Sequence, residues 1–259
     1  MEPPPPVSEL QATPKPPVMS IPGRLVNIFA APGDVFDDIK DSPASTSNWL
    51  VPILILVVVG WICSGIILSQ ESFRHQVSDL VEKSIQKQIE SSHMPEQQAD
   101  MARKMGEITW KVNVAVGPAI VAFITPFLWG FFLWLVGRKA FKANLPYMKA
   151  VEIVGLATTI GVLEAVVKTL LIFVTGNIMA SATLGLFIKD FDPQNPTHSL
   201  LAAVNVMTFW MLAVRAIGLA RFTNTPASRA IGWVFGIWLS YTAFFWAIGT
   251  AIQHIFAKK

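Results

Sequence analysis

The chain has 259 residues, of which 53% are hydrophobic and only 14% are charged. A soluble globular protein carries about 25% charged residues, so this composition excludes an ordinary water-soluble domain. The net charge of +3 is small and the basic residues are scattered, so nothing indicates a nucleic-acid partner.

Residues 1–20 are rich in proline, beginning with the run from Pro3 to Pro6. Such a segment has too little apolar surface to offset the entropy of ordering, so we expect a disordered tail. Residues 21–48 carry two apolar helical stripes, one around Ile28 and one around Phe36. They predict short amphipathic helices at the membrane interface. Packing on the protein's own loops is an equal alternative.

Three long stretches, 42–70, 112–137 and 230–257, contain no Asp, Glu, Lys or Arg. A transmembrane helix needs about 20 apolar residues, and a run of this length in lipid must be helical because its backbone groups can only bond to each other. We therefore predict an all-α, polytopic membrane protein with its membrane domain over residues 49–256. The five predicted spans are 49–69, 112–136, 151–174, 200–220 and 230–256.

The polar segment 70–111 has the apolar periodicity of two helices, interrupted around Pro95. It predicts a helical hairpin outside the bilayer. The orientation follows from the short loop after the second span, which holds Arg138, Lys139, Lys142 and Lys149 but no acid. Because short cytoplasmic loops are rich in Lys and Arg, we expect a cytoplasmic N-terminus and an outside C-terminus, in the cell membrane. The bases of the 70–111 loop argue against this orientation.

Two charged residues within the third span, Glu164 and Lys168, have the i, i+4 spacing of a helical ion pair. We predict an intramembrane charge pair with a structural role, although ionisable residues inside a span can also mark an ion or proton pathway. Arg215, in the fourth span, is a further intramembrane charge. It could extend to the basic side of the membrane or approach Glu164.

Small residues recur at helical spacing in two spans, where they permit close helix packing. The stripe in the fifth span fits either packing within the bundle or a dimer interface. The predicted helix-packing residues are Ala157, Gly161 and Ala165 in the third span, and Gly232, Gly236 and Ser240 in the fifth.

Several chemical signatures are missing from the sequence. It contains no glycine-rich phosphate loop, GxSxG, HExxH or CxxC motif. The histidines are dispersed, and the single cysteine, Cys63, lies in an apolar run that disfavours a thiolate. We therefore expect no catalytic residues, no metal site and no cofactor.

Several short segments nevertheless resemble a known family. Phe29-Ala-Ala-Pro32 through Val35-Phe36-Asp37-Asp38-Ile39, then Trp49-Leu-Val-Pro52, and later Asn205-Val-Met-Thr-Phe-Trp210 with Gly218-Leu-Ala220, resemble the bacterial branch of the Yip family of Ypt/Rab-interacting membrane proteins. The eukaryotic relatives have a hallmark Asp-Leu-Tyr-Gly-Pro stretch that is missing here, and position 205 is Asn where the bacterial pattern commonly has an acid. The resemblance therefore implies five spans but no Rab partner.

Together, these features predict a non-enzymatic membrane protein that acts in membrane organisation or as a partner-binding scaffold. Its expected partners are the lipid bilayer and a membrane protein or a second copy of the chain. The alternative is a small-solute or ion transporter or channel that uses Glu164, Lys168 and Arg215. An odd number of spans and the absence of an evident repeat count against a transporter.

Overall fold

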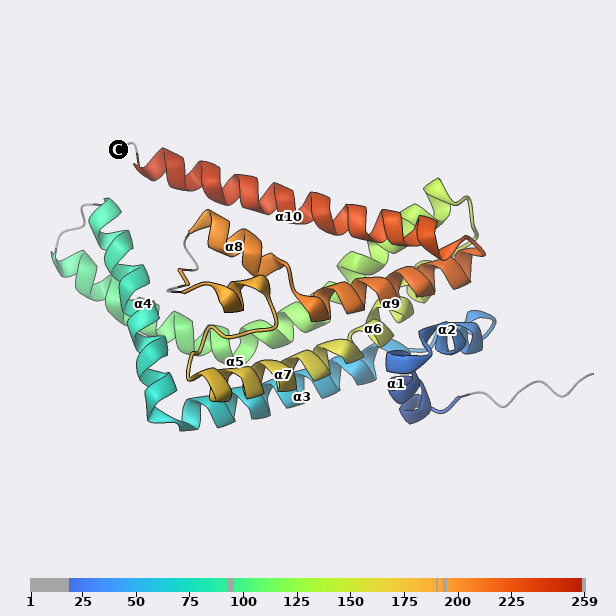
Figure 1. Cartoon of the computed structure of the whole chain (residues 1–259), viewed down its shortest axis with the longest axis horizontal. Coiled ribbons are helices and arrows are strands. Elements are labelled where there is room, and N and C mark those ends of the chain that lie inside the picture. Colours follow the sequence, from blue (N-terminus) through green and yellow to red (C-terminus); the bar gives the residue numbers. More distant parts are fainter. Residues whose placement is uncertain (1–18, 93–95, 190, 193–194, 258–259) are drawn as a thin grey trace, which may run out of the picture.

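The computed structural model describes residues 19–92, 96–189, 191–192 and 195–257. Most of the predicted tail, residues 1–18, lies outside this part of the chain. Apart from one antiparallel bridge between Thr183 and Asn205, the described residues form helices, turns and loops (Figure 1). The all-α prediction is therefore confirmed.

Five helices are long and apolar enough to cross a membrane, as predicted. Four of them are α3 (Ser47–Ser69), the latter part of α5 (Glu96–Leu135) with its π-helical end (Val136–Ala140), α9 (Val206–Thr223) and α10 (Ala227–Ala257). The remaining span consists of two successive helices, α6 (Tyr147–Ala157) and α7 (Thr159–Thr175). These helices run roughly side by side along the long axis of the molecule (Figure 1).

Two spans differ from their predicted form. The third is divided at Thr158, whose hydroxyl donates to the carbonyl of Val154. The fourth begins at Val206, because residues predicted to belong to it form a separate short helix, α8 (Pro196–Ala203). Asn205 then caps the new helix by accepting from the N–H of Met207 and of Thr208. This cap, rather than hydropathy, fixes the start of the span.

The hairpin predicted over residues 70–111 consists of α4 (Glu71–Ser92) and the first part of α5. Arg103 and Glu82 form an ion pair of 3.5 Å between the two helices, and Ile85 packs closely over Gly106. The second arm does not end at the span: α5 is one continuous helix of 40 residues. At 1.5 Å per residue it is about 60 Å long, roughly twice the thickness of the hydrocarbon core.

The N-terminal helices α1 (Ile21–Ala30) and α2 (Pro32–Lys40) pack against the bundle. Four side chains of their apolar stripes, Ile28, Val35, Phe36 and Ile39, are fully buried in the main core. Burying each such side chain is worth about 1.5–3 kcal/mol. The stripes thus pack into the protein's own main core, and the place of these helices at the bilayer surface stays a prediction.

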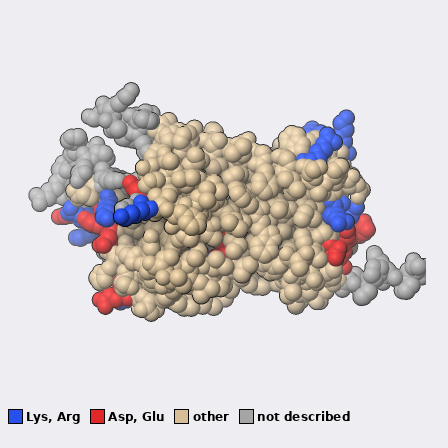
Figure 2. All heavy atoms as spheres, in the orientation of Figure 1, with Lys and Arg blue, Asp and Glu red and all other residues tan. Residues whose placement is uncertain are grey.

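The charges gather at the two ends of the molecule. Figure 2 shows Lys, Arg, Asp and Glu at both ends and a nearly uncharged surface between them. This distribution is what a bilayer requires of the surface that faces its hydrocarbon.

Candidate functional site

The end that carries α1 and α2 contains two buried polar networks. In the first, Arg24 forms a 2.9 Å ion pair with Asp38 and donates to Asn48 Oδ1 at 2.8 Å. Arg24 is only 7% exposed and Asn48 1%. The network ties α1 to both α2 and the start of α3.

The second network centres on Lys149, which was predicted to be one of the bases of a short loop. Its ammonium group is buried and donates to Glu152 Oε2 at 3.1 Å and to the Ile39 carbonyl at 2.8 Å. The other oxygen of Glu152 accepts from the N–H of Ser45. Lys149 thus holds the end of α2 against α6, and its charge is compensated within the protein.

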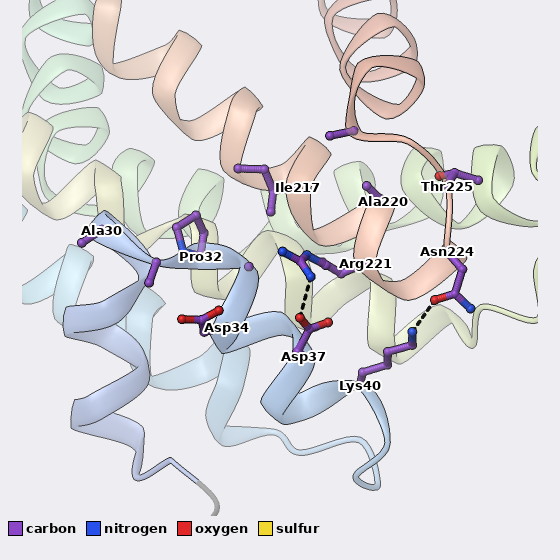
Figure 3. Close-up of a pocket in the computed structure, with 13 residues that line it drawn as sticks. Ala30, Pro32, Asp34, Asp37, Lys40, Ile217, Ala220, Arg221, Asn224 and Thr225 are labelled. Carbon is purple, nitrogen blue, oxygen red and sulfur yellow. Dashed lines mark hydrogen bonds and ion pairs between the residues drawn. The ribbon is translucent and has the colours of Figure 1, made fainter. Parts of the chain in front are cut away.

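A cleft of about 660 Å³ opens between the α1–α2 turn and the α9–α10 turn (Figure 3). Two bridges cross from α2 to the end of α9. Asp37 Oδ2 accepts from Arg221 Nη1 at 2.8 Å, and Lys40 Nζ donates to Asn224 Oδ1. Both partners of the ion pair are about half exposed, so the bridge contributes little to stability but defines the shape of the cleft.

The local sequence explains this geometry. Ala31 breaks the helix with φ −133°, and Pro32 begins the next one, where its missing N–H has no cost. A Cβ on Gly33 would lie 2.8 Å from Arg221 Nη2, so any larger residue here would require the guanidinium group of Arg221 to shift. Asn224 has a positive φ of 50° and ends α9.

Asp34 is the free acid of the cleft. Its side chain is exposed and forms no hydrogen bond or ion pair with any residue that the structure describes. In Figure 3 it lies on the same side of α2 as Asp37. The cleft therefore presents one acid that has no partner among the described residues, beside two bridges that are already satisfied (Figure 3).

The residues predicted as an intramembrane charge pair have separate surroundings. Glu164 Oε1 accepts a 2.6 Å hydrogen bond from Asn205 Nδ2, whereas Lys168 is exposed on α7. No ion pair between Glu164 and Lys168 occurs among the described residues. The structure brings Glu164 together with the cap of α9, and a charge pair with Lys168 stays a prediction.

Arg215 lies within the bundle and does not reach the basic end. It is 4% exposed, and its guanidinium carbon lies 4.8 Å from the centre of the Trp129 ring. Its Nη2 contacts the sulfur of Met211 at 2.9 Å. Within the described chain it forms no ion pair with Glu164 or any other acid.

The two small-residue stripes have different environments. Ala157 is fully buried in the core, Gly161 faces side chains of Leu56 and Met211 at ordinary contact distance, and Ala165 lines a cavity beside α3. In α10, a Cβ on Gly232 or Gly236 would meet nothing within 4 Å. These two glycines and Ser240 line an open, apolar groove of about 780 Å³ beside α5.

The cleft residues were absent from the predicted site. A signal for them existed: the acids of residues 34–38 and the basic turn after the fourth span are of opposite sign. Their meeting depends on α2 folding back onto α9, which no local pattern encodes. The same holds for Arg24 and Asp38.

The fold and the surface define a multi-pass helical membrane protein with a polar cleft at one end. Sequence comparison identifies the family: the Yip1 domain matches residues 26–249, and the chain belongs to the Yip1 domain family. No curated protein and no solved structure matches the chain. The family resemblance noted in the sequence is thereby confirmed.

Proposed function

We propose that this protein is a non-enzymatic membrane scaffold that binds a partner protein at the cleft between α2 and α9. The observation that carries this proposal is the cleft itself, an open cavity of about 660 Å³ outside the apolar belt, with Asp34 left unpaired. A partner segment that offers a Lys or Arg side chain would complement this charge.

The alternative, transport, requires a pathway through the membrane. Glu164, Lys168 and Arg215 were its expected elements, but the structure gives each a different environment. Glu164 is engaged with Asn205, and Arg215 is enclosed against Trp129. This separation favours a scaffold over a transporter.

The scaffold proposal can be tested by site-specific photocrosslinking in cells. A photoreactive amino acid at Ala227, an exposed position that lines the cleft, should give a discrete crosslinked protein. The same amino acid at Asn144, an exposed position on the same end that does not line the cleft, is the control for general proximity.

A change of charge on α2, on the opposite wall of the cleft, makes the test specific. Asp34→Asn should lower the crosslinked product several-fold, because it removes the free acid of the cleft. Asp41→Asn is the matched control, since Asp41 is an exposed acid at the end of α2 that does not line the cleft. Equal crosslinking at both positions, or an unchanged product in Asp34→Asn, would contradict the proposal. A solute flux in liposomes that Glu164→Gln abolishes would favour a transporter.

We further propose that the cleft faces the cytoplasm and that the protein resides in the cell membrane. The end with the cleft bears exposed Arg138, Lys139, Lys142, Arg221 and Arg229. Short basic loops are the mark of the cytoplasmic side. In this orientation the cleft is accessible to cytoplasmic proteins.

A further inference from the structure

Arg215 occupies an unusual position for an arginine. It is the tenth residue of an 18-residue spanning helix, which places it roughly 12–14 Å along the axis from either end of α9. A charged side chain near the centre of a bilayer is costly and is normally paired or directed into a cavity. Arg215 forms no ion pair within the described chain.

The hydrogen-bonding capacity of this guanidinium group is largely unused. Nε is buried and has no hydrogen-bond partner among the described residues. Nη2 has only the Met211 sulfur, and a thioether is a weak acceptor. The Trp129 ring stabilises the cation through its face, but it leaves the in-plane N–H groups free for an acceptor.

A cavity of about 540 Å³ adjoins this group. Its walls come from α3, α5, α7 and α9, together with Thr158 between α6 and α7, and its lining is almost wholly apolar. Besides Arg215, only small hydroxyls and an indole add polarity. They are Ser64, Thr125, Thr158 and Trp61. No carboxylate belongs to the lining, so nothing in the cavity neutralises the arginine.

We propose that this cavity binds an anionic amphiphile, whose oxyanion pairs with Arg215 and whose acyl chain fills the apolar space. Carboxylate and phosphate groups both match the planar fork of a guanidinium group. The apolar lining selects a chain-bearing ligand over a free inorganic anion, which would have to shed its hydration to enter. The volume is in the range of small-molecule sites.

Native mass spectrometry of the purified full chain in a non-ionic detergent tests this proposal. Oleate and dioleoyl phosphatidate are the probes, oleyl alcohol is the matched neutral probe, and inorganic phosphate is the matched free oxyanion. We expect the two anionic amphiphiles to bind and the alcohol and phosphate to bind at least tenfold more weakly, because each lacks one half of the recognised chemistry.

Two variants test the charge of Arg215 and the volume of the cavity separately. Arg215→Met removes the cation, and Gly60→Leu fills the cavity, since a Cβ on Gly60 meets nothing within 4 Å and the residue lines the cavity. Both should lose roughly tenfold or more in affinity for oleate. Gly65→Leu is the matched control: it is the same change in the same helix at an equally open position outside the cavity, and it should bind as the original chain does.

The outcomes are decisive in each direction. Unchanged oleate binding in a folded Arg215→Met or Gly60→Leu protein would overturn the proposal, as would equal binding of oleate and oleyl alcohol. Binding of inorganic phosphate as tight as that of phosphatidate would show a free-oxyanion site and overturn the amphiphile. Because Gly60→Leu leaves the charge in place, the test remains valid even if Arg215→Met does not fold.

Discussion

Asn205 joins two elements through opposite ends of one amide. Its Oδ1 caps α9 and its Nδ2 donates to Glu164 on α7 at 2.6 Å. Aspartate is as good a helix cap as asparagine, but it has no N–H to donate. Asn205→Asp therefore keeps the cap and replaces a hydrogen bond by two facing carboxylates.

We expect Asn205→Asp to lower the free energy of unfolding by about 2 kcal/mol, the value of a hydrogen bond to a charged group. Adding Glu164→Gln should restore most of that loss, because the new amide can donate to the new carboxylate in the reverse direction. Chemical denaturation in detergent micelles measures the free energy of unfolding of both variants. An Asn205→Asp protein as stable as the original would contradict the geometry. A stronger coupling of Glu164 to Lys168 than to Asn205 would instead support the predicted charge pair.

The partners of single residues were the least predictable feature. The i, i+4 rule places Glu164 and Lys168 on one helical face, but it says nothing about competitors from another helix. Asn205 is 41 residues away in sequence and becomes such a competitor only after α9 packs on α7. The burial of Lys149 could not be predicted for the same reason: its partner Ile39 lies on another element, whereas its sequence neighbours are typical of an exposed basic loop.

At the scale of elements, α3 and α6 approach closely at Gly155. A Cβ at this position would overlap Cα and Cβ of Trp49 and lie 3.1 Å from the Asn48 carbonyl oxygen. Because these atoms lie in or on the backbone of α3, no side-chain rotation can relieve the overlap. The two helices would have to separate.

Gly155→Ala should therefore destabilise the protein by about 1–3 kcal/mol, as expected for overpacking. Gly65→Ala in α3 is the control, because its Cβ would meet nothing within 4 Å and alanine is the better helix former. Thermal unfolding in detergent distinguishes them. Equal melting temperatures for the two variants would show that α3 and α6 are not in close contact.

The elements themselves could largely be predicted, because hydrocarbon excludes charge and the long uncharged stretches therefore mark the spans. What hydropathy could not provide was the break at Thr158 or the start of α9 at Val206. The start of α9 depends on a single cap, Asn205, and the break at Thr158 lies inside a continuously apolar segment. The apolar stripes of α1 and α2 could be recognised in the sequence. What they pack against could not be predicted, because a helix on a membrane surface and a helix on a protein core need the same apolar face.

At the scale of the whole molecule, the orientation in the membrane is open to a direct test. With Cys63 replaced by Ser, single cysteines at Ser78 on α4 and at Asn144 near the cleft place labels on opposite ends; both positions are exposed. If the basic end is cytoplasmic, an impermeant thiol reagent should label the first in intact cells and the second only after permeabilisation. The reverse pattern would invert the orientation.

The continuity of α5 has a mechanical consequence. One unbroken helix runs from the α4–α5 hairpin through the membrane, with Pro118 and Pro126 within it. The missing N–H of a proline weakens the helix locally. The two most flexible points of this long helix therefore lie inside the bilayer. In the same part of α5, Pro118, Ala119 and Ala122 form one wall of the cavity beside Arg215. A displacement of the hairpin is therefore expected to bend α5 at Pro118 and Pro126, and Pro118 is itself part of the cavity wall.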